Sequence, residues 1–265
     1  MAYSLEGKVV LITGAAGGFG AAMIRQFLQA GSRLVLADLA QDALSARVAG
    51  IVKAAQLEPR MGQILGYIGA DLASDAGCAA VHAQTVAITP HIGMLVNNAG
   101  IAMSGHFTDM PQAQWEQLMA INLLAPMRLT YRFLPAMMAR RSGYIVNISS
   151  LAGIAGTPMI VPYSTAKFGL RGFGEALANE LAPYHINTTN LYPFFARTAI
   201  LESPHYGAAP RTQLPDRILY SPDFVIEQLL RGIRRRRREV FPGAVPRVAY
   251  WLRRFAPFAL PKMAA

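Results

Sequence analysis

The chain has 265 residues and is 53% hydrophobic, which is long and apolar enough for one α/β domain with a sizeable core. A single cysteine, Cys78, excludes an internal disulfide and a CxxC metal site, and it fits a reducing compartment. The formal charge is +10, yet nine arginines against one acid between Arg231 and Arg254 account for +8 of it. A local charge of this kind, without interleaved aromatic residues, argues against a nucleic-acid partner.

The start of the chain shows no targeting signal. The first eight residues carry an acidic Glu6 and no apolar stretch of signal-peptide length. No apolar run approaches the roughly 18 to 20 residues that a membrane-spanning helix needs. We therefore expect a cytoplasmic protein.

Short apolar runs alternate with helical patterns along the chain. Strands are expected at 9–12, 34–37, 64–68, 94–96, 144–148 and 186–191. Helices are expected at 21–30, 43–55, 115–138 and 166–181. Strands that alternate with helices predict a parallel sheet covered on both faces, which is a single-domain, doubly wound α/β fold of the Rossmann type.

Two segments depart from this alternation. Four prolines lie among polar and aromatic residues between 199 and 222, and a long irregular segment inside a compact domain is often a lid. From residue 244 onward the chain becomes an amphipathic basic tail. The predicted organisation is a main domain over 1–243, with a lid at about 199–222, and a tail over 244–265.

A glycine-rich turn follows the first strand directly, with the sequence Thr13-Gly14-Ala15-Ala16-Gly17-Gly18-Phe19-Gly20. Glycines here permit a tight turn and let a pyrophosphate approach the backbone. The N-terminus of the next helix attracts that group through its free N–H groups and its dipole. A glycine-rich turn without a ligand is the alternative interpretation.

Asp38 ends the second strand, twenty positions after Gly18, where an acid can hydrogen-bond the ribose hydroxyls of a dinucleotide. Its carboxylate would repel a 2′-phosphate, and neither Gly17 nor Leu39 offers a cation that offsets the repulsion. The sequence therefore favours NAD over NADP as the cofactor. A solvated loop acid or a helix N-cap is the alternative role for Asp38.

Tyr163 and Lys167 are four positions apart, so on a helix they share one face. A nearby ammonium favours the phenolate, which predicts a lowered pKa for Tyr163 and makes it usable as an acid and base. Ser150 follows the strand 144–148, at the sheet edge where open α/β folds bind ligands, and it can hydrogen-bond a substrate oxygen. An amphipathic helix that carries Tyr and Lys by chance is the alternative.

The spacing of these glycines resembles that of the short-chain dehydrogenase/reductase family. Further family motifs follow in order: Asp71-Leu72, Asn97-Asn98-Ala99-Gly100, Asn122, Ser149-Ser150, Tyr163-Ser164-Thr165-Ala166-Lys167, and Pro193 with Thr198. Together they cover about residues 5 to 200. Seven motifs in register make a chance resemblance improbable, although each motif alone is weak.

The resemblance implies a set of functional residues. The catalytic ones are Asn122, Ser150, Tyr163 and Lys167, with Asn122 positioning a water that continues a proton path from Lys167. The dinucleotide site comprises Gly14, Gly18, Phe19, Gly20, Asp38, Asp71, Leu72, Asn98, Tyr163, Lys167 and Thr198. In it Asp71 and Leu72 flank the adenine, Asn98 lies beside the adenosine, and Thr198 holds the nicotinamide carboxamide. Residues 1–243 are then the dinucleotide-binding catalytic domain, and the protein forms a dimer or tetramer of identical chains.

Two residues depart from the family pattern. Phe194 follows Pro193 where relatives usually carry glycine, and Phe19 replaces a more usual aliphatic residue. A side chain at position 194 restricts the backbone beside the nicotinamide. The hydride face and the room in the pocket therefore stay open.

The implied reaction moves a hydride between a carbinol carbon and the nicotinamide, while Tyr163 moves the hydroxyl proton. No metal is needed, and none of the five histidines has metal-ligand spacing. The expected pocket walls are Leu151, Met159, Ile160, Val161, Phe194 and Phe195. These apolar walls favour a hydrophobic secondary alcohol or ketone. A non-catalytic dinucleotide sensor and an NADP-dependent carbonyl reductase are the alternatives.

The tail carries its own pattern. Val248, Trp251, Leu252 and Phe255 share one helical face, while Arg247, Arg253 and Arg254 fall on the other. This pattern predicts an interfacial helix that makes a peripheral membrane contact. Docking on a partner or on a second copy of the chain is the alternative, and the run 234–238 is equally consistent with a solvated helix C-terminus.

Overall fold

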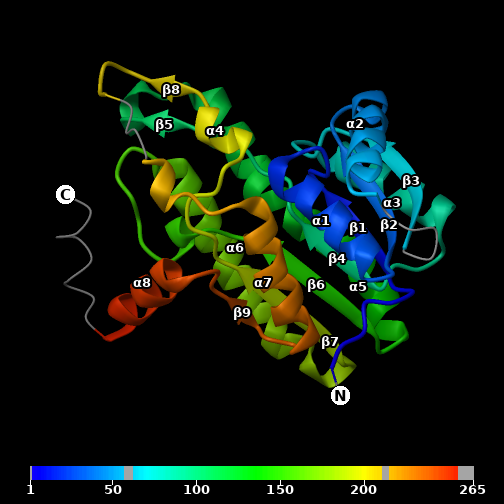
Figure 1. Ribbon diagram of the computed structural model, residues 1–265. Coiled ribbons are helices and arrows are strands. Elements are labelled where there is room, and N and C mark those ends of the chain that lie inside the picture. Colours follow the sequence, from blue (N-terminus) through cyan, green and yellow to red (C-terminus); the bar gives the residue numbers. More distant parts are fainter. Residues whose placement is uncertain (1, 57–61, 211–214, 256–265) are drawn as a thin grey trace.

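The computed structural model describes residues 2–56, 62–210 and 215–255. A seven-stranded parallel sheet forms its centre, in the order β3-β2-β1-β4-β6-β7-β9 (Figure 1). The strands are β1 (Val9–Thr13), β2 (Arg33–Asp38), β3 (Gln63–Gly69), β4 (Met94–Asn97), β6 (Gly143–Ile148), β7 (Ile186–Leu191) and β9 (Glu239–Val240). The strand order reverses between β1 and β4, which confirms the doubly wound α/β fold.

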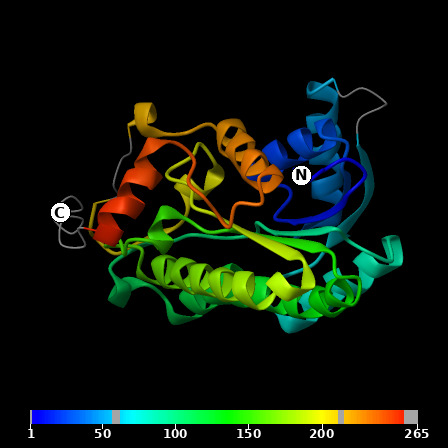
Figure 2. The same cartoon turned by 90° about the horizontal axis from the view of Figure 1, so that it is seen from below.

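Helices cover both faces of the sheet (Figure 2). One face carries α1 (Gly18–Gln29), α2 (Gln41–Ala54) and α7 (Pro222–Arg234), and the other carries α3 (Asp75–Ile88), α5 (Ala125–Ala139) and α6 (Val161–Glu180). The last helix, α8 (Ala244–Phe255), follows the edge strand β9 and lies at the opposite end of the molecule from β3 (Figure 1).

Burial on both faces explains why β1, β2 and β4 are nearly continuous apolar runs. In β1, Val10 and Ile12 belong to the core beneath α1 and α7, whereas Leu11 belongs to the core beneath α3 and α5. All three side chains are fully buried. The sheet edge is therefore held rigidly from both sides, and the loops after the strands start from fixed points.

Several elements differ from the sequence-based prediction. The helix expected at 115–138 is α4 (Gln112–Met119), one π-helical turn (Ala120–Leu124) and α5. Helices α3 and α7 were missed. The sequence of α3 is rich in small residues and has weak periodicity, so its main signal is the Ser74 cap, whose Oγ accepts from the Gly77 N–H. Helix α7 begins at Pro222 inside the predicted irregular segment, because proline is favoured at the first helical position.

The described part of the predicted lid before α7, residues 199–210 and 215–221, consists of short elements. It contains turns at Ala199–Glu202 and Asp216–Ile218 and the strand β8 (His205–Tyr206). β8 pairs in parallel with β5 (Ser104–Gly105), which lies just beyond β4. In the described part of the chain, no helix has the length and apolar character to cross a membrane.

Candidate active site

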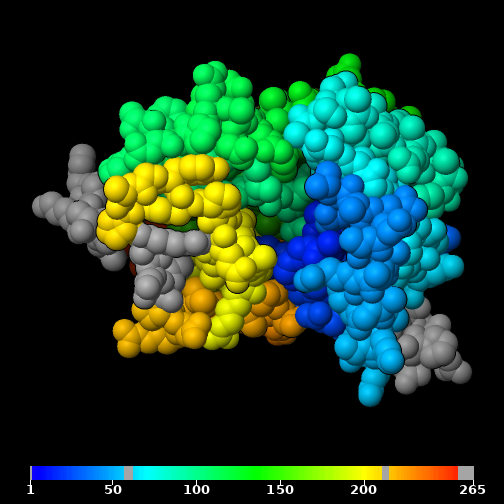
Figure 3. Space-filling view, turned by 90° about the horizontal axis from the view of Figure 1, so that it is seen from above, coloured from blue at the N-terminus to red at the C-terminus, as the bar shows by residue number. Residues whose placement is uncertain are grey.

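The predicted site residues gather at the carboxyl ends of the strands, around the reversal between β1 and β4. In Figure 3 the yellow segment near residue 200 faces the dark-blue segment that holds the glycine-rich turn, and the surface is hollowed between them. This is the edge at which open α/β sheets bind ligands. The crevice brings together one group of residues from the glycine-rich turn and another from β6 and α6.

The glycine-rich turn has no room for side chains at two key positions. Gly14 has a left-handed φ of +63°, and a Cβ there would lie 2.7 Å from the Ala99 Cα. A Cβ on Gly18 would lie 2.6 Å from the Thr198 Cγ2. The turn therefore packs directly on the chain beyond β4 and on Thr198. The structure thus brings the predicted residues Gly14, Gly18 and Thr198 together.

Asp38 and Asn98 hold the turn from the two neighbouring strands. The Asp38 carboxylate accepts the Ala16 N–H at 2.7 Å and the Leu39 N–H at 2.8 Å. The Asn98 amide donates to the carbonyl oxygens of Thr13 and Gly14, both at 2.9 Å. Asp38 thus lies half-buried at the end of β2 beside the turn, where it can also reach a ribose.

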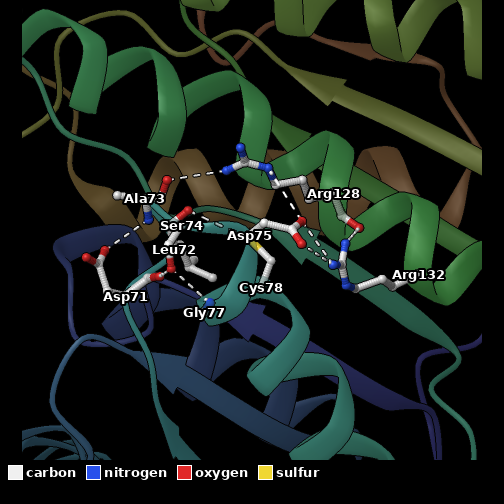
Figure 4. A network of polar contacts seen from close by, with 9 residues as sticks. All are labelled: Asp71, Leu72, Ala73, Ser74, Asp75, Gly77, Cys78, Arg128 and Arg132. Carbon is white, nitrogen blue, oxygen red and sulfur yellow. Dashed lines mark hydrogen bonds and ion pairs between the residues drawn. The ribbon is translucent and has the colours of Figure 1, made fainter.

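The Asp71-Leu72 pair forms a tight turn between β3 and α3 (Figure 4). The Asp71 carboxylate accepts the Ala73 N–H at 2.9 Å, and Leu72 is buried. The following Asp75 bonds the Arg132 guanidinium through both oxygens at 2.9 Å, which ties α3 to α5 (Figure 4). The turn is thereby positioned at the same sheet edge as Asp38.

Ser150, Tyr163 and Lys167 meet at the other end of the crevice. Ser150 ends the loop after β6, and its Oγ accepts the Ala152 N–H at 3.1 Å. Ser150 and Tyr163 are hydrogen-bonded through their side chains. The Lys167 Nζ lies 5.5 Å from the centroid of the Tyr163 ring and donates to the Ile148 carbonyl at 2.8 Å. The helical spacing on α6 and the loop after β6 thus bring the Tyr163 phenol, the Lys167 ammonium and the Ser150 hydroxyl into one cluster.

Asn122 lies in the π-helical turn between α4 and α5 and is fully buried. Its amide exchanges two hydrogen bonds with the backbone of Ile101, at 2.9 and 2.8 Å. A Cβ on Gly100 would lie 3.2 Å from the Asn122 Oδ1 and 3.6 Å from the Lys167 Nζ. The absence of a side chain at Gly100 therefore lets the two polar groups approach the same space.

The electrostatics differ from the prediction made from spacing. Burial raises the pKa of Tyr163, and its hydrogen bond with Ser150 only partly opposes this. Burial also lowers the pKa of Lys167 to about 8. The expected lowering of the Tyr163 pKa is wrong, because the low-dielectric surroundings disfavour the charged forms of both groups.

Sequence reasoning missed residues that position this cluster. The Ser149 hydroxyl donates to the Lys167 carbonyl at 3.1 Å, and Gly153 packs against both residues with no room for a Cβ. Beyond Ser150, the Leu151 N–H donates to the Pro193 carbonyl at 2.9 Å. Glycine at 153 was the only local signal, since these contacts join β6, α6 and the loop after β7.

The strands β5 and β8 join two segments that are distant in sequence. The Ser104 Oγ and the His205 Nδ1 are 2.8 Å apart, and the His205 Nε2 is 2.6 Å from the Ala209 carbonyl oxygen. Because a carbonyl oxygen only accepts, Nε2 donates to the Ala209 carbonyl. Tyr206 and Tyr163 pack against one apolar cluster that includes Met103.

Phe194 takes part in an aromatic group rather than standing alone. Its ring makes edge contacts with Phe195 at 4.8 Å and Tyr220 at 6.5 Å between centroids. The Tyr220 backbone bonds Phe195 and Arg197, so the two ends of the lid segment are joined. Across the ranges 2–56, 62–210 and 215–255, no group of His, Cys, Asp and Glu could hold a metal ion.

A glycine-rich turn at a helix N-terminus and a Ser-Tyr-Lys cluster in one α/β crevice are features of a class of protein, the dinucleotide-dependent oxidoreductases. The profile of the short chain dehydrogenase family matches residues 8–205. The chain belongs to the short-chain dehydrogenase/reductase family and is an oxidoreductase.

Three known proteins illustrate the similarity. Estradiol 17-beta-dehydrogenase 11 of Macaca fascicularis is 30% identical over 241 residues, which is 90% of this chain and 75% of that protein. A short-chain dehydrogenase of Sphingobium yanoikuyae, solved with NADPH, has a TM-score of 0.80 at 28% identity and covers 96% of this chain and 95% of its own. A family member of Burkholderia phymatum, solved with NAD, has a TM-score of 0.82 at 24% identity, covers 95% and 94%, and shows the fold alone.

Proposed function

We propose that this protein is an NAD(H)-dependent enzyme that interconverts a hydrophobic secondary alcohol and its ketone. The observation that carries the proposal is the cluster of Ser150, Tyr163 and Lys167 in the same crevice as the glycine-rich turn. The turn suits a dinucleotide, because it lies at the N-terminus of α1, where free backbone N–H groups and the helix dipole attract a pyrophosphate. Asp38, half-buried beside it, suits a free ribose 2′-hydroxyl.

The chain's own groups supply the proton chemistry. When bound, the dinucleotide supplies the hydride acceptor for oxidation and the hydride donor for reduction. The Ser150 hydroxyl hydrogen-bonds the substrate oxygen and directs it to the Tyr163 phenol. Tyr163 takes the hydroxyl proton during oxidation and returns one during reduction. The Lys167 ammonium beside the ring stabilises the phenolate that oxidation requires.

A polar path leads away from Tyr163 toward the interior. Lys167 uses one N–H for the Ile148 carbonyl, which leaves its other protons directed to the space beside Gly100. The Asn122 amide borders that space and is held rigid by its two bonds to Ile101. In this scheme Asn122 positions a water that exchanges protons with Lys167.

The substrate side is apolar. Tyr163 and Tyr206 pack against the apolar cluster that contains Met103. Phe194 and Phe195 lie in the loop after β7, with their ring centroids 4.8 Å apart. Such walls bind a hydrophobic substrate better than a sugar or an organic acid. The relative named estradiol 17-beta-dehydrogenase 11 acts, by its name, on a bulky hydrophobic alcohol, which supports the same substrate class here.

A panel of secondary alcohols and ketones of increasing size tests the activity. NADH absorbance should change with bulky apolar members and remain constant with sugars and hydroxy acids. A panel with no turnover in either direction, for protein that binds NADH by fluorescence, would favour the non-catalytic sensor.

Asp38→Ser tests the cofactor. Wild-type kcat/KM should be higher with NAD(H) than with NADP(H), because the Asp38 carboxylate repels a 2′-phosphate. Serine keeps an acceptor for the Ala16 N–H but removes the charge. The ratio of kcat/KM with NAD(H) to kcat/KM with NADP(H) should therefore fall about tenfold or more. A tenfold change corresponds to about one pKa unit of interaction energy. Equal efficiency of the wild type with both cofactors would favour the NADP-dependent carbonyl reductase. The similar short-chain dehydrogenase of Sphingobium yanoikuyae was solved with NADPH.

We also propose that the protein is a homo-oligomer that associates through α5 and α6. Leu124 at the start of α5, Met127 and Tyr131 on α5, and Phe168 on α6 are exposed apolar side chains. An exposed patch of this kind on a globular domain marks an interaction surface. Light scattering should show a dimer or tetramer, and Tyr131→Glu should reduce its mass to that of one chain.

A further inference from the structure

Helix α8 exposes its apolar face to solvent. Val245, Val248, Trp251 and Phe255 follow one another at intervals of three, three and four residues, which places them on one side of a helix. Their exposed fractions are 44%, 55%, 54% and 73%. A surface helix normally turns such a stripe toward the core. Here the stripe has no covering from the described residues of the chain.

The opposite side of α8 holds the helix in place. Pro246 is buried, and the Tyr250 ring lies 4.7 Å from the Phe241 ring. The Arg171 guanidinium of α6 lies 5.8 Å from the Tyr250 centroid. The helix is therefore attached through Pro246 and Tyr250, which leaves the stripe exposed. Figure 2 shows α8, in red, at one end of the molecule.

The charge around the stripe has one sign. From Val240 to the C-terminus the sequence contains Arg247, Arg253, Arg254 and Lys262 and no acid. The three arginines are exposed. The exposed apolar side chains Met127 and Tyr131 on α5 have a different charge environment. The arginines beside them, Arg128 and Arg132, are paired with Asp75. The arginines of α8 make no ion pair with a described acid, so their charge is available to an anionic partner.

We propose that the α8 stripe docks on the surface of an anionic lipid bilayer. A helix of twelve residues is about 18 Å long, too short to cross a bilayer, but an apolar stripe flanked by arginines lies well in its interface. The Trp251 and Phe255 rings are stacked at 5.4 Å, and such aromatic groups favour the headgroup region.

A second copy of the chain fits the stripe less well. Two α8 helices packed about a two-fold axis would bring their arginines together without an acid on either helix. Like charges repel, and the repulsion grows as water is excluded from the contact. Anionic headgroups instead neutralise the same arginines. The charge pattern therefore selects the bilayer over self-association.

Co-sedimentation of the full-length protein with vesicles tests the proposal. The vesicles are phosphatidylcholine alone, or phosphatidylcholine and phosphatidylserine at roughly 7:3, in about 50 mM and about 500 mM salt. The wild type should pellet with the anionic vesicles at low salt and be released at high salt. Trp251→Ser with Phe255→Ser should abolish binding. Arg253→Gln with Arg254→Gln should weaken partitioning about 30-fold, since each arginine contributes about a fivefold effect.

Arg234→Gln with Arg235→Gln is the matched control, because it removes the same charge from an exposed site outside α8 and should leave binding unchanged. Equal loss in this control, no binding at low salt, or unaltered binding by the serine variant would overturn the proposal. A lower oligomer mass of the serine variant in light scattering would also overturn it, by making the stripe an interface between copies.

A spectroscopic readout keeps the test independent of protein yield. The chain has two tryptophans, Trp115 and Trp251, so in a Trp115→Phe background the emission reports on α8 alone. A blue shift with anionic vesicles supports insertion of Trp251, and no shift contradicts it. Both measurements are made without substrate, so their outcome is separate from that of the proposed enzymatic activity.

Discussion

The cofactor half and the substrate half of the crevice are built in different ways. In the cofactor half, Gly14, Asp38 and Asn98 come from the ends of three adjacent strands and hold one another through the backbone. In the substrate half, Ser104 meets His205, 101 positions away, through two strands of two residues. The first arrangement inherits the rigidity of the sheet, whereas the second depends on few contacts and opens more readily.

The catalytic cluster lies between the two halves. Removing the phenol proton of Tyr163 should have the largest effect on kcat of the changes considered. Tyr163→Phe keeps the ring that packs against the cluster containing Met103 but removes the transferable proton. We expect kcat to fall about 10²- to 10⁴-fold with NADH affinity unchanged. Stopped-flow turnover and NADH fluorescence titration measure the two quantities. A near wild-type rate would show that another group is the acid and base.

A side chain at Gly14 should damage the rigid half. Gly14→Ala places a Cβ against the backbone of Ala99 at a left-handed φ, so the free energy of unfolding should fall by about 1–3 kcal/mol. Dinucleotide affinity should fall with it, because the turn must shift. Gly50→Ala in α2 is the control, since a Cβ there meets nothing within 4 Å and should stabilise slightly. Equal urea midpoints for the two variants would contradict this account.

Lys167 trades stability for function. Its pKa falls from 10.5 to about 8 on folding, so the buried charge costs roughly 3 kcal/mol at neutral pH, and this cost disappears as pH rises from about 8 to 10.5. Lys167→Met also loses the bond to Ile148, worth about 1 kcal/mol, so it should stabilise the protein by about 2 kcal/mol below pH 8. Thermal unfolding at several pH values measures this. A less stable variant at pH 7 would contradict it.

The pH profile provides the kinetic counterpart. Because the pKa of Tyr163 is raised, oxidation should accelerate toward alkaline pH while reduction persists there with a protonated phenol. A profile of kcat/KM for oxidation that levels off below pH 7 would show that the phenol titrates lower than its burial allows.

The smallest effect is expected in the substrate half. His205→Gln replaces the ring that bonds the Ser104 Oγ through Nδ1 and the Ala209 carbonyl oxygen through Nε2. KM for bulky substrates should rise a few-fold, because one hydrogen bond contributes about 1 kcal/mol, while kcat stays close to that of the wild type. Steady-state kinetics with a small and a large ketone separate the two constants. A loss in kcat alone would place His205 in the chemistry instead.

Motif spacing predicted which site residues lie together where the residues belong to one local unit of the fold. Gly14 and Asp38 lie on consecutive elements of one βαβ unit, so their meeting follows from strand and helix lengths alone. Tyr163 and Lys167 lie one turn apart on α6 for the same reason. The contacts of Ser149, Gly153 and His205 were not predicted, because their partners are on elements that become neighbours only when the sheet is packed.

The sequence by itself determined the strands β1 to β4, β6 and β7, the amphipathic character of α8 and the residue types of the catalytic cluster, since these depend on periodicity and local spacing. Only the tertiary structure decided that the Tyr163 pKa is raised, because burial depends on every neighbour of the phenol. It also decided that α8 turns its apolar stripe outward, because the contacts of Pro246 and Tyr250 set the rotation of the helix. A periodic pattern specifies a face, and only packing specifies where that face points.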